Sequence, residues 1–312
     1  MTLPDPSNPC RIGTRGSPLA LAQAHETRAR LMAAFDLEED AFEITVIKTT
    51  GDRVTDRPLS QIGGKGLFTK EIEEALLSGA IDIAVHSMKD MPVEQPQGLM
   101  IDACLPREDV RDAFVTLDGR ALGDLPKGAT VGTSSIRRRA QLLHSRPDLN
   151  VVEFRGNVQT RLGKLRDQVA VGTFLAMAGL SRLGLLGEVK ATPVEPEDML
   201  PAVAQGAIGI ERRTDDTAAA ALLDAIRHPE TEARLAAERA FLAELDGSCQ
   251  APIAALAKID GDRLTLWGEI LKPDGSKAES GWREGGVQDG AAMRRDLAKA
   301  LLATAGPGFL EI

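Results

Sequence analysis

The chain has 312 residues, of which 43% are apolar and 27% charged, so it is long enough to bury more than one hydrophobic core. Its longest nearly apolar run, Val169 to Leu180, is too short to cross a bilayer, and residues 1–10 lack the basic and apolar regions of a signal peptide. Three cysteines are too few for a disulfide framework, and four scattered histidines without a CxxC pair favour no metal site. We therefore expect a cytoplasmic, multidomain globular protein without a metal.

The net charge of −9 conceals a basic cluster. Between Arg137 and Arg166 there are seven arginines and one lysine against two acidic residues, a local balance of +6. A nucleic-acid surface is one explanation, but Phe154 is the only aromatic residue in this segment and the chain has no tyrosine. A small anionic ligand explains the cluster better. Solvated helix faces account for Arg139, Arg146 and Arg166.

The first expected element is a strand that opens directly into a helix. Residues 11–14 form the apolar run, and Arg15 and Ser17 follow in a short polar turn. Ser17 is in N-cap position and Pro18 is at the first helical position. A strand at 42–49 follows the helix, which predicts a βαβ unit.

A long loop and a buried strand come next. Residues 51–66 have little periodicity and predict a mobile loop, and such loops in compact domains are usually functional. The apolar run 81–86 predicts a strand, which ends at Ser87, Lys89 and Asp90. Lys89 and Asp90 form either an exposed ion pair or a substrate-binding cation beside an acid–base carboxylate, and the residues alone leave both interpretations open.

Two further strand-to-helix junctions carry arginine. Residues 130–132 lead into Thr133-Ser134-Ser135-Ile136-Arg137-Arg138-Arg139, and residues 151–154 lead into Arg155-Gly156-Asn157. Asn157 would cap a helix that has Arg161 in its first turn. Each junction combines unpaired backbone N–H groups, the positive end of a helix dipole and a guanidinium group. In open α/β sheets ligands bind at the carboxyl ends of strands, so the pattern predicts a site for a ligand with many carboxylates.

The order of these elements predicts two α/β lobes and a smaller domain. Residues 105–109 and the proline-rich segment 192–201 are interpreted as two crossings between the lobes, after which residues 204–211 form a strand that rejoins the first lobe. A double crossover would give a cleft with a hinge. We expect domain 1 at 9–105 and 204–226, domain 2 at 110–199, and domain 3 at 227–312.

Domain 3 has a different pattern, typical of an α+β fold. An alanine-rich helix leads to a turn at 246–249, and strands at 253–259 and 264–270 are joined by the hairpin signal Asp260-Gly261. A final helix is expected at 288–303. Cys249 lies in the turn. A lone cysteine is most often an inert small hydrophobe, but a thiol on a turn is accessible to a reactant.

Six segments in order resemble one enzyme family. They are GGKGLF (63–68), IDIAVHSMKDMP (81–92), GTSSIRRR (132–139), FRGNVQTRL (154–162), LPAVAQGAIGIE (200–211) and GSCQAPI (247–253). Together they resemble porphobilinogen deaminase, also called hydroxymethylbilane synthase. The resemblance implies three domains, the first two like periplasmic binding proteins. It also implies a dipyrromethane cofactor on a cysteine thioether and condensation of four porphobilinogen molecules, with loss of ammonia, to hydroxymethylbilane.

The resemblance also implies roles for particular residues. Asp90 matches the catalytic aspartate, which would stabilise the cationic azafulvenium formed when ammonia leaves the substrate. The positions implied to hold the cofactor are Cys249, Lys89, Ser87, Thr133, Ser134, Ser135, Arg137, Arg138 and Arg161. The positions implied to bind substrate or the growing chain are Arg15, Ser17, Gln23, Arg155, Asn157, Arg161 and Arg182.

The implied partners are few. Porphobilinogen is the small-molecule substrate, a downstream tetrapyrrole enzyme is the expected recipient of the product, and neither nucleic acid nor a membrane is expected. The family implies a monomer. Two alternatives remain at this point: a cytoplasmic sensor with a binding-protein fold, which gives Cys249 no role, and a nucleic-acid binder, which gives Asp90 no role and whose affinity falls steeply with salt.

Overall fold

The computed structural model describes residues 3–53, 67–245 and 251–310. The chain divides into two compact units, one of residues 1–108 with 207–232 and the other of residues 109–206 with 233–312. The chain thus leaves the first unit after residue 108, returns to it at residue 207 and leaves it again after residue 232; the first departure and the return form the predicted double crossover. The predicted boundaries of three domains stay a prediction.

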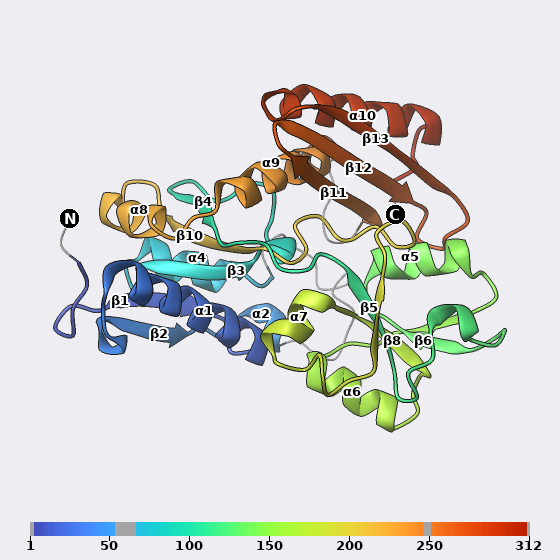
Figure 1. Cartoon of the computed structure of the whole chain (residues 1–312), viewed down its shortest axis with the longest axis horizontal. Coiled ribbons are helices and arrows are strands. Elements are labelled where there is room, and N and C mark those ends of the chain that lie inside the picture. Colours follow the sequence, from blue (N-terminus) through green and yellow to red (C-terminus); the bar gives the residue numbers. More distant parts are fainter. Residues whose placement is uncertain (1–2, 54–66, 246–250, 311–312) are drawn as a thin grey trace. The chain divides into compact units, whose positions relative to one another are not determined.

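The first unit is built on a mixed five-stranded sheet (Figure 1). Its strands are β1 (Cys10–Thr14), β2 (Phe42–Val46), β3 (Ile83–Ser87), β4 (Leu99–Cys104) and β10 (Ile208–Arg213), in the order β2-β1-β3-β10-β4. β1 runs parallel to β2 and β3, whereas β10 runs antiparallel to β3 and β4. The returning strand is therefore inserted in the middle of the sheet. It begins at Ile208, four residues later than the expected start at 204.

Helices cover both faces of this sheet because both faces are apolar. The helical elements are α1 (Pro18–Phe35), η1 (Glu39–Ala41), α2 (Thr50–Arg53), α4 (Lys70–Leu77), η2 (Met88–Asp90) and α8 (Thr217–Asp224). In β3, Ile83 and Val85 pack in one core with α1 and α8, while Ala84 packs in another with α4. α2 occupies the start of the segment predicted as a loop, and residues 54–66 lie outside the described residues.

The second unit contains another mixed five-stranded sheet. Its strands are β5 (Asp112–Thr116), β6 (Thr130–Gly132), β7 (Asn150–Val152), β8 (Gly172–Ala176) and β9 (Ala191–Val194), in the order β7-β6-β8-β5-β9. Its helical elements are η3 (Leu122–Asp124), α5 (Ile136–Ser145), α6 (Val158–Arg166) and α7 (Met177–Arg182). α5 packs in one core with Phe114 and Phe174, while α6 and α7 pack in the other with Val115 and Leu175. β9 is an edge strand in part of the segment interpreted as a plain crossing.

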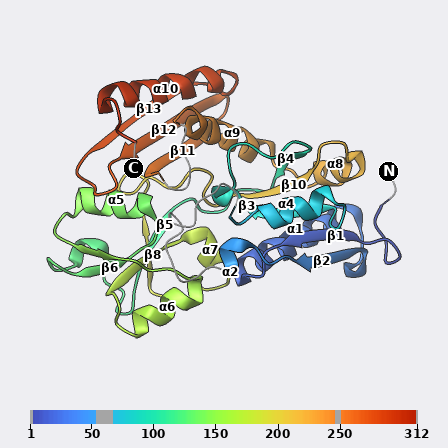
Figure 2. The same cartoon turned by 180° about the vertical axis from the view of Figure 1, so that it is seen from behind.

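The same unit includes a three-stranded antiparallel sheet. It consists of β11 (Ile253–Asp260), β12 (Arg263–Leu271) and β13 (Ala278–Gly286), and η4 (Val287–Asp289) and α10 (Gly290–Ala305) follow it. The helix that precedes it, α9 (Pro229–Glu244), begins within the residues of the first unit and ends within those of the second. The hairpin at Asp260-Gly261 is confirmed, with Gly261 at φ +60°. β13 was not expected from the sequence. Figure 2 shows α10 running along this sheet, where it contacts β12 and β13. The predicted fold class, two α/β lobes plus a small α+β part, is confirmed.

Among the described residues, no helix combines the length and the apolarity that a membrane span requires.

Close packing in the three-stranded sheet gives a stability prediction. A Cβ at Gly268 would lie 2.5 Å from the ring of Phe241, whereas a Cβ at Gly163 in α6 would meet nothing within 4 Å. We expect Gly268→Ala to lower the free energy of unfolding by roughly 1–3 kcal/mol because the ring must move. Gly163→Ala should raise it by up to about 1 kcal/mol through helix propensity. Urea denaturation measures both, and equal effects would contradict the packing described.

Candidate active site

The β1–α1 junction forms as its sequence predicts. Ser17 is the N-cap of α1, its Oγ accepts a hydrogen bond from the backbone N–H of Ala20 at 3.2 Å, and Pro18 is the first helical residue. The guanidinium carbon of Arg15 lies 4.1 Å from the centre of the Phe68 ring. This stacking holds the Arg15 guanidinium group beside the N-terminus of α1. Both the guanidinium charge and the positive end of the helix dipole attract an anion.

The adjacent strand β3 ends beside the same junction. Gln23 Nε2 on α1 donates to Ser87 Oγ at 2.8 Å, which ties the helix to the end of β3. Asp90 follows in the short helix η2 and is exposed to solvent. The predicted residues of β1–α1 and the predicted catalytic carboxylate therefore come from neighbouring strands of one sheet.

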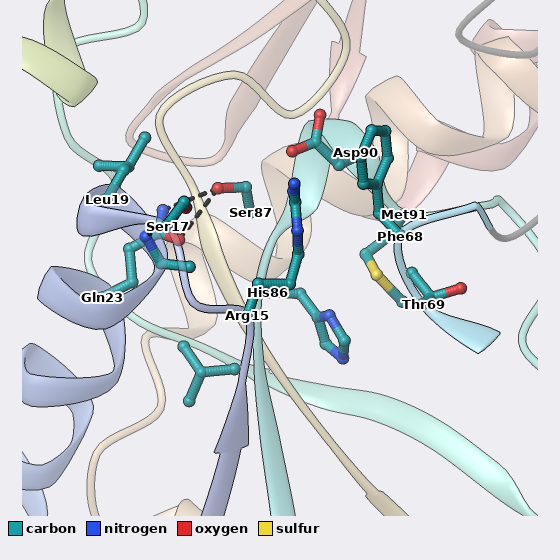
Figure 3. Close-up of a pocket in the computed structure, with 12 residues that line it drawn as sticks. Arg15, Ser17, Leu19, Gln23, Phe68, Thr69, His86, Ser87, Asp90 and Met91 are labelled. Atoms are coloured by element: carbon teal, nitrogen blue, oxygen red, sulfur yellow. Dashed lines mark hydrogen bonds between the residues drawn. The ribbon is translucent and has the colours of Figure 1, made fainter. Parts of the chain in front are cut away.

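These residues line one pocket of the first unit (Figure 3). Five predicted site residues are among its lining: Arg15, Ser17, Gln23, Ser87 and Asp90. The remaining lining residues were not predicted as site residues, namely Leu19, Ala20, Phe68, Thr69, Val85, His86 and Met91. The pocket thus combines a cation, hydroxyl groups and a carboxylate with apolar and aromatic walls, the composition typical of a small-molecule site.

His86, one of the lining residues, belongs to a buried polar pair. His86 Nε2 is 3.1 Å from Glu211 Oε2 on β10, and both side chains are buried. Glu73 on α4 is also buried, and its burial raises the pKa of its carboxyl group. No local sequence signal indicates this pair, because its two residues lie 125 positions apart.

The β6–α5 junction contains the serines and threonine that were predicted to hold cofactor carboxylates. Ser135 is the N-cap of α5 and accepts a hydrogen bond from the backbone N–H of Arg138 at 3.4 Å. Thr133 Oγ1 accepts from the N–H of Ser135, and Ser134 Oγ accepts from the N–H of Phe154 at the next junction. The two basic junctions of this sheet are therefore joined by a direct hydrogen bond.

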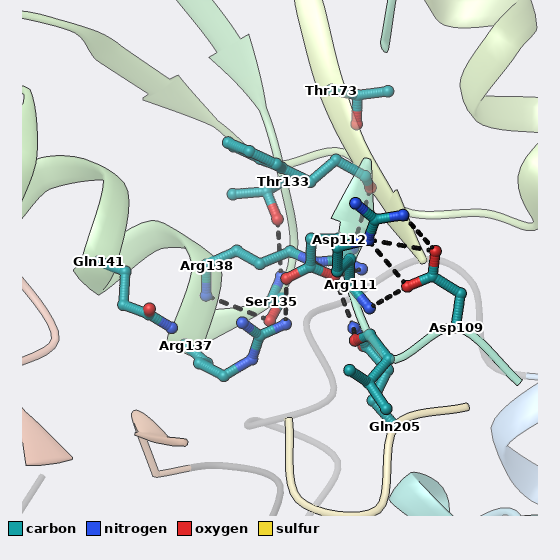
Figure 4. A network of polar contacts seen from close by, with 12 residues as sticks. Asp109, Arg111, Asp112, Thr133, Ser135, Arg137, Arg138, Gln141, Thr173 and Gln205 are labelled. Atoms are coloured by element: carbon teal, nitrogen blue, oxygen red, sulfur yellow. Dashed lines mark hydrogen bonds and ion pairs between the residues drawn. The ribbon is translucent and has the colours of Figure 1, made fainter. Parts of the chain in front are cut away.

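Arg137 and Arg138 extend from the first turn of α5 to one buried carboxylate (Figure 4). Arg137 NH2 donates to Asp112 Oδ2 at 2.7 Å, and Arg138 NH2 donates to Asp112 Oδ1 at 2.7 Å. Burial by itself would raise the pKa of Asp112, but the two guanidinium charges outweigh it and hold that pKa well below its usual range. Asp112 was not predicted as a site residue, because nothing local to it indicates a partner 25 residues away.

The β7–α6 junction is also capped as predicted. Asn157 Oδ1 accepts from the backbone N–H of Thr160 at 2.9 Å. Arg161 Nε donates to the carbonyl of Gly156, whose φ of +123° is one that glycine adopts readily. Arg155, in the turn itself, is half-buried.

The remaining predicted residues lie apart from these junctions or outside the described residues. Arg182, the last residue of α7, donates from NH1 to the carbonyl of Gly206 at 3.1 Å. Lys89 lies in η2, beside Asp90. Cys249 lies outside the described residues, so its predicted position on a turn stays a prediction.

Cationic groups and helix N-termini at the carboxyl ends of strands define a protein that binds small anions, and Asp90 adds a carboxylate suited to proton transfer. Residues 10–221 match the family model described as porphobilinogen deaminase, dipyromethane cofactor binding domain, and residues 233–303 match the model of the porphobilinogen deaminase C-terminal domain. The chain belongs to the porphobilinogen deaminase family, a family of transferase enzymes with a dipyrromethane cofactor. The predicted resemblance is confirmed.

Two curated relatives of this chain are named porphobilinogen deaminase. The chain is 66% identical over 309 residues to the porphobilinogen deaminase of Paracoccus denitrificans, covering 99% of this chain and 98% of that protein. It is 53% identical over 302 residues to the enzyme of Nitrobacter winogradskyi, covering 96% and 95% respectively. Among solved structures, a periplasmic binding protein from Salmonella typhimurium matches 72% of this chain and 95% of its own, at 16% identity and a TM-score of 0.40.

Proposed function

We propose that this chain is a hydroxymethylbilane synthase of tetrapyrrole biosynthesis. It condenses four porphobilinogen molecules onto a covalent primer, releases ammonia at each condensation, and frees hydroxymethylbilane by hydrolysis. The observation that carries the proposal is Asp90 at the end of β3, in one pocket with Arg15 and the capped N-terminus of α1. Porphobilinogen has two carboxylates and one reactive aminomethyl group. In this pocket, Arg15 and the N-terminus of α1 have the opposite charge to a carboxylate, and Asp90 has the opposite charge to the aminomethyl group.

Within the pocket, Arg15 and Ser17 bind a substrate carboxylate and Asp90 faces the aminomethyl carbon. When ammonia leaves, positive charge develops on the pyrrole and its methylene carbon, and the charge of Asp90 stabilises it. The same carboxylate hydrogen-bonds the pyrrole N–H and accepts the proton lost after the new carbon–carbon bond forms. The Gln23–Ser87 hydrogen bond fixes the two elements that carry these groups.

The residues of the β6–α5 junction fit a dipyrromethane group. Arg137 Nε is buried and, within the described part of the chain, has no hydrogen-bond partner, so a donor is left for a carboxylate. In the second unit, Arg137, Arg138, Arg161 and the hydroxyl groups of Thr133, Ser134 and Ser135 would hold the cofactor, and the Cys249 thiol would form the thioether. When bound, the dipyrromethane supplies a terminal pyrrole carbon as the nucleophile and so acts as the primer.

The proposal also includes the location, the oligomeric state and the partners of the protein. We place the enzyme in the cytoplasm as a monomer, with porphobilinogen as its only substrate and a downstream tetrapyrrole enzyme as recipient of the product. A sensor with the same fold would bind porphobilinogen without consuming it. Incubation with porphobilinogen tests the difference: the enzyme releases ammonia and hydroxymethylbilane in a ratio of about four to one. Binding without ammonia release would refute the proposal.

The arginines give a second prediction, which separates loading of the cofactor from elongation. Arg137→Leu or Arg138→Leu should impair cofactor assembly, because each removes a cation from the β6–α5 junction. Arg155→Leu or Arg182→Leu should leave the cofactor attached but slow substrate entry or later condensations. Intact mass spectrometry of each variant, before and after a limited supply of porphobilinogen, resolves the cofactor and the partial chains.

Arg166 provides the matched control for this series, because it lies at the exposed C-terminal end of α6. Arg166→Leu should load and turn over like the unmodified protein. If all four junction variants behaved like Arg166→Leu, the assignment of these arginines to pyrrole carboxylates would be wrong.

A further inference from the structure

Asp112, the first residue of β5, connects the two arginines that the proposed function assigns to the cofactor. Its side chain has no solvent exposure, and both of its oxygens are used. Oδ2 accepts from Arg137 NH2 at 2.7 Å, while Oδ1 accepts from Arg138 NH2 at 2.7 Å and from Arg138 Nε at 3.2 Å. Gln205 Nε2 adds a neutral hydrogen bond to Oδ1 at 2.9 Å.

The remaining hydrogen bonds fix the plane of each guanidinium group. Arg137 NH1 donates to the carbonyl of Leu200 at 2.7 Å, and Arg138 NH1 donates to the carbonyl of Phe174 at 2.9 Å. Each arginine thus has one backbone partner and the shared carboxylate. Two such partners determine the direction of a planar fork, so the free donor Nε of Arg137 has a fixed position at the first turn of α5.

The charge of the cluster matches one further anion. Two guanidinium groups and one carboxylate leave a single positive charge, buried beside the N-terminus of α5. Glu269 on β12 also interacts electrostatically with Arg137, and burial raises the pKa of its carboxyl group. His144 on α5 also faces Glu269, with its Nδ1 bound at 3.0 Å to the carbonyl of Gly275. Within the cluster itself, the two guanidinium groups share the single carboxylate of Asp112.

We propose that Asp112 is a positioning residue, which holds the guanidinium groups of Arg137 and Arg138 in the orientation that receives a carboxylate of the pyrrole primer. The inference rests on the proposed function and deepens it. Asp112 does not touch the primer, because its oxygens are acceptors that are already occupied, and it acts through the arginines. A buried ion pair that serves stability alone is the competing explanation.

Charge and orientation predict opposite effects for one substitution. Asp112→Asn keeps the size of the side chain but removes its negative charge, so the net charge of the cluster rises. If charge alone governed anion binding, the variant would load the primer at least as well as the unmodified protein. If Asp112 orients the arginines, loading fails although the site has become more positive. A loss of loading in this variant would therefore show that the orientation of the two arginines, and not the net charge, governs loading.

The experiment uses the full-length apoprotein, reconstituted with porphobilinogen, and measures by intact mass the fraction that carries two pyrrole units. We expect Asp112→Asn to reduce the loading rate about tenfold or more, as loss of hydrogen bonds to charged groups typically does. Two controls accompany it. Leu165→Ala removes a buried side chain of α6 and lowers stability without touching the cluster. Asp148→Asn removes a carboxylate that binds Arg146, beyond the other end of α5.

Both controls should load at the unmodified rate when compared at conditions of equal folded fraction. Loading of Asp112→Asn at the rate of Leu165→Ala, or faster, overturns the inference. If Asp112→Asn does not fold, Gln205→Met provides the second test, since it preserves every charge and removes the hydrogen bonds that Gln205 Nε2 donates to Asp112 Oδ1 and to the carbonyl of Val110. Its loading rate should fall severalfold, and an unchanged rate would overturn the inference. Absence of any adduct on the unmodified protein refutes the proposed function, and the inference falls with it.

Discussion

Asp90→Asn is expected to lower kcat by roughly 10²–10³-fold, the usual loss when one group that stabilises transition-state charge is removed. Asparagine keeps the shape and much of the hydrogen bonding of Asp90 but carries no charge. Substrate still binds through Arg15 and Ser17, so KM should change little and the loss should fall on the chemical step. Steady-state kinetics of ammonia release measures both constants.

Asp90→Glu separates charge from geometry. The charge remains but moves by one methylene, so measurable activity should persist, with slower condensations and accumulation of enzyme-bound partial chains. Asp40→Asn, at an exposed position in η1, is the control and should leave kcat unchanged. If the asparagine variant proved faster than the glutamate variant, stabilisation by Asp90 would be abandoned and Asp52 in α2 would become the candidate carboxylate.

Cys249→Ser should abolish turnover because the variant cannot form the thioether. The thiolate is the reactive form of cysteine, and a serine hydroxyl ionises far less readily, so the variant should fold without a covalent primer. Cys10 and Cys104 provide the controls, since neither forms a disulfide among the described residues and both are buried. Burial raises the pKa of the Cys10 thiol to about 12, which makes it unreactive at neutral pH.

Replacement of Cys10 or Cys104 by alanine should therefore leave the adduct and the activity in place, apart from a packing cost. Intact mass and ammonia release are measured on all three variants. A Cys249→Ser protein with normal turnover and an unchanged adduct would show that another residue carries the primer.

Local features of the fold were predictable because their signals lie within a few residues. Ser17 and Asn157 cap their helices as expected, and Gly261 forms the expected hairpin turn. Each depends on one side chain or one backbone conformation and on neighbours at most three positions away. The same holds for the arginines at the strand ends, whose positions follow from the boundaries of the elements.

Among the strands that were not predicted, β9 and β13 form because tertiary contacts override their local preference. β9 contains Pro193, which an edge strand tolerates because its missing N–H can face away from the neighbouring strand. β13 has several glycines and charged residues, which strands usually disfavour. It forms because it pairs with β12 along nine residues, and Gly281 allows the close approach of Leu297 and Leu301 from α10.

In the candidate site, too, residues in local motifs were predictable, whereas partners distant in the sequence were not. The groups proposed to contact ligands lie in short motifs, so the sequence and the family resemblance could single them out as candidates. They did not identify the partners of these groups. Asp112 meets Arg137 across 25 positions, and Glu211 meets His86 across 125, and such pairs are specified only by the completed sheets.

The most direct test of the whole account is the intact mass of the purified, unmodified protein, followed by mapping of the modified peptide. We expect a mass that exceeds that of the bare chain by two pyrrole units, with the added mass on the peptide that contains Cys249. A protein at the mass of the bare chain, or an adduct on Cys10 or Cys104, would contradict the account.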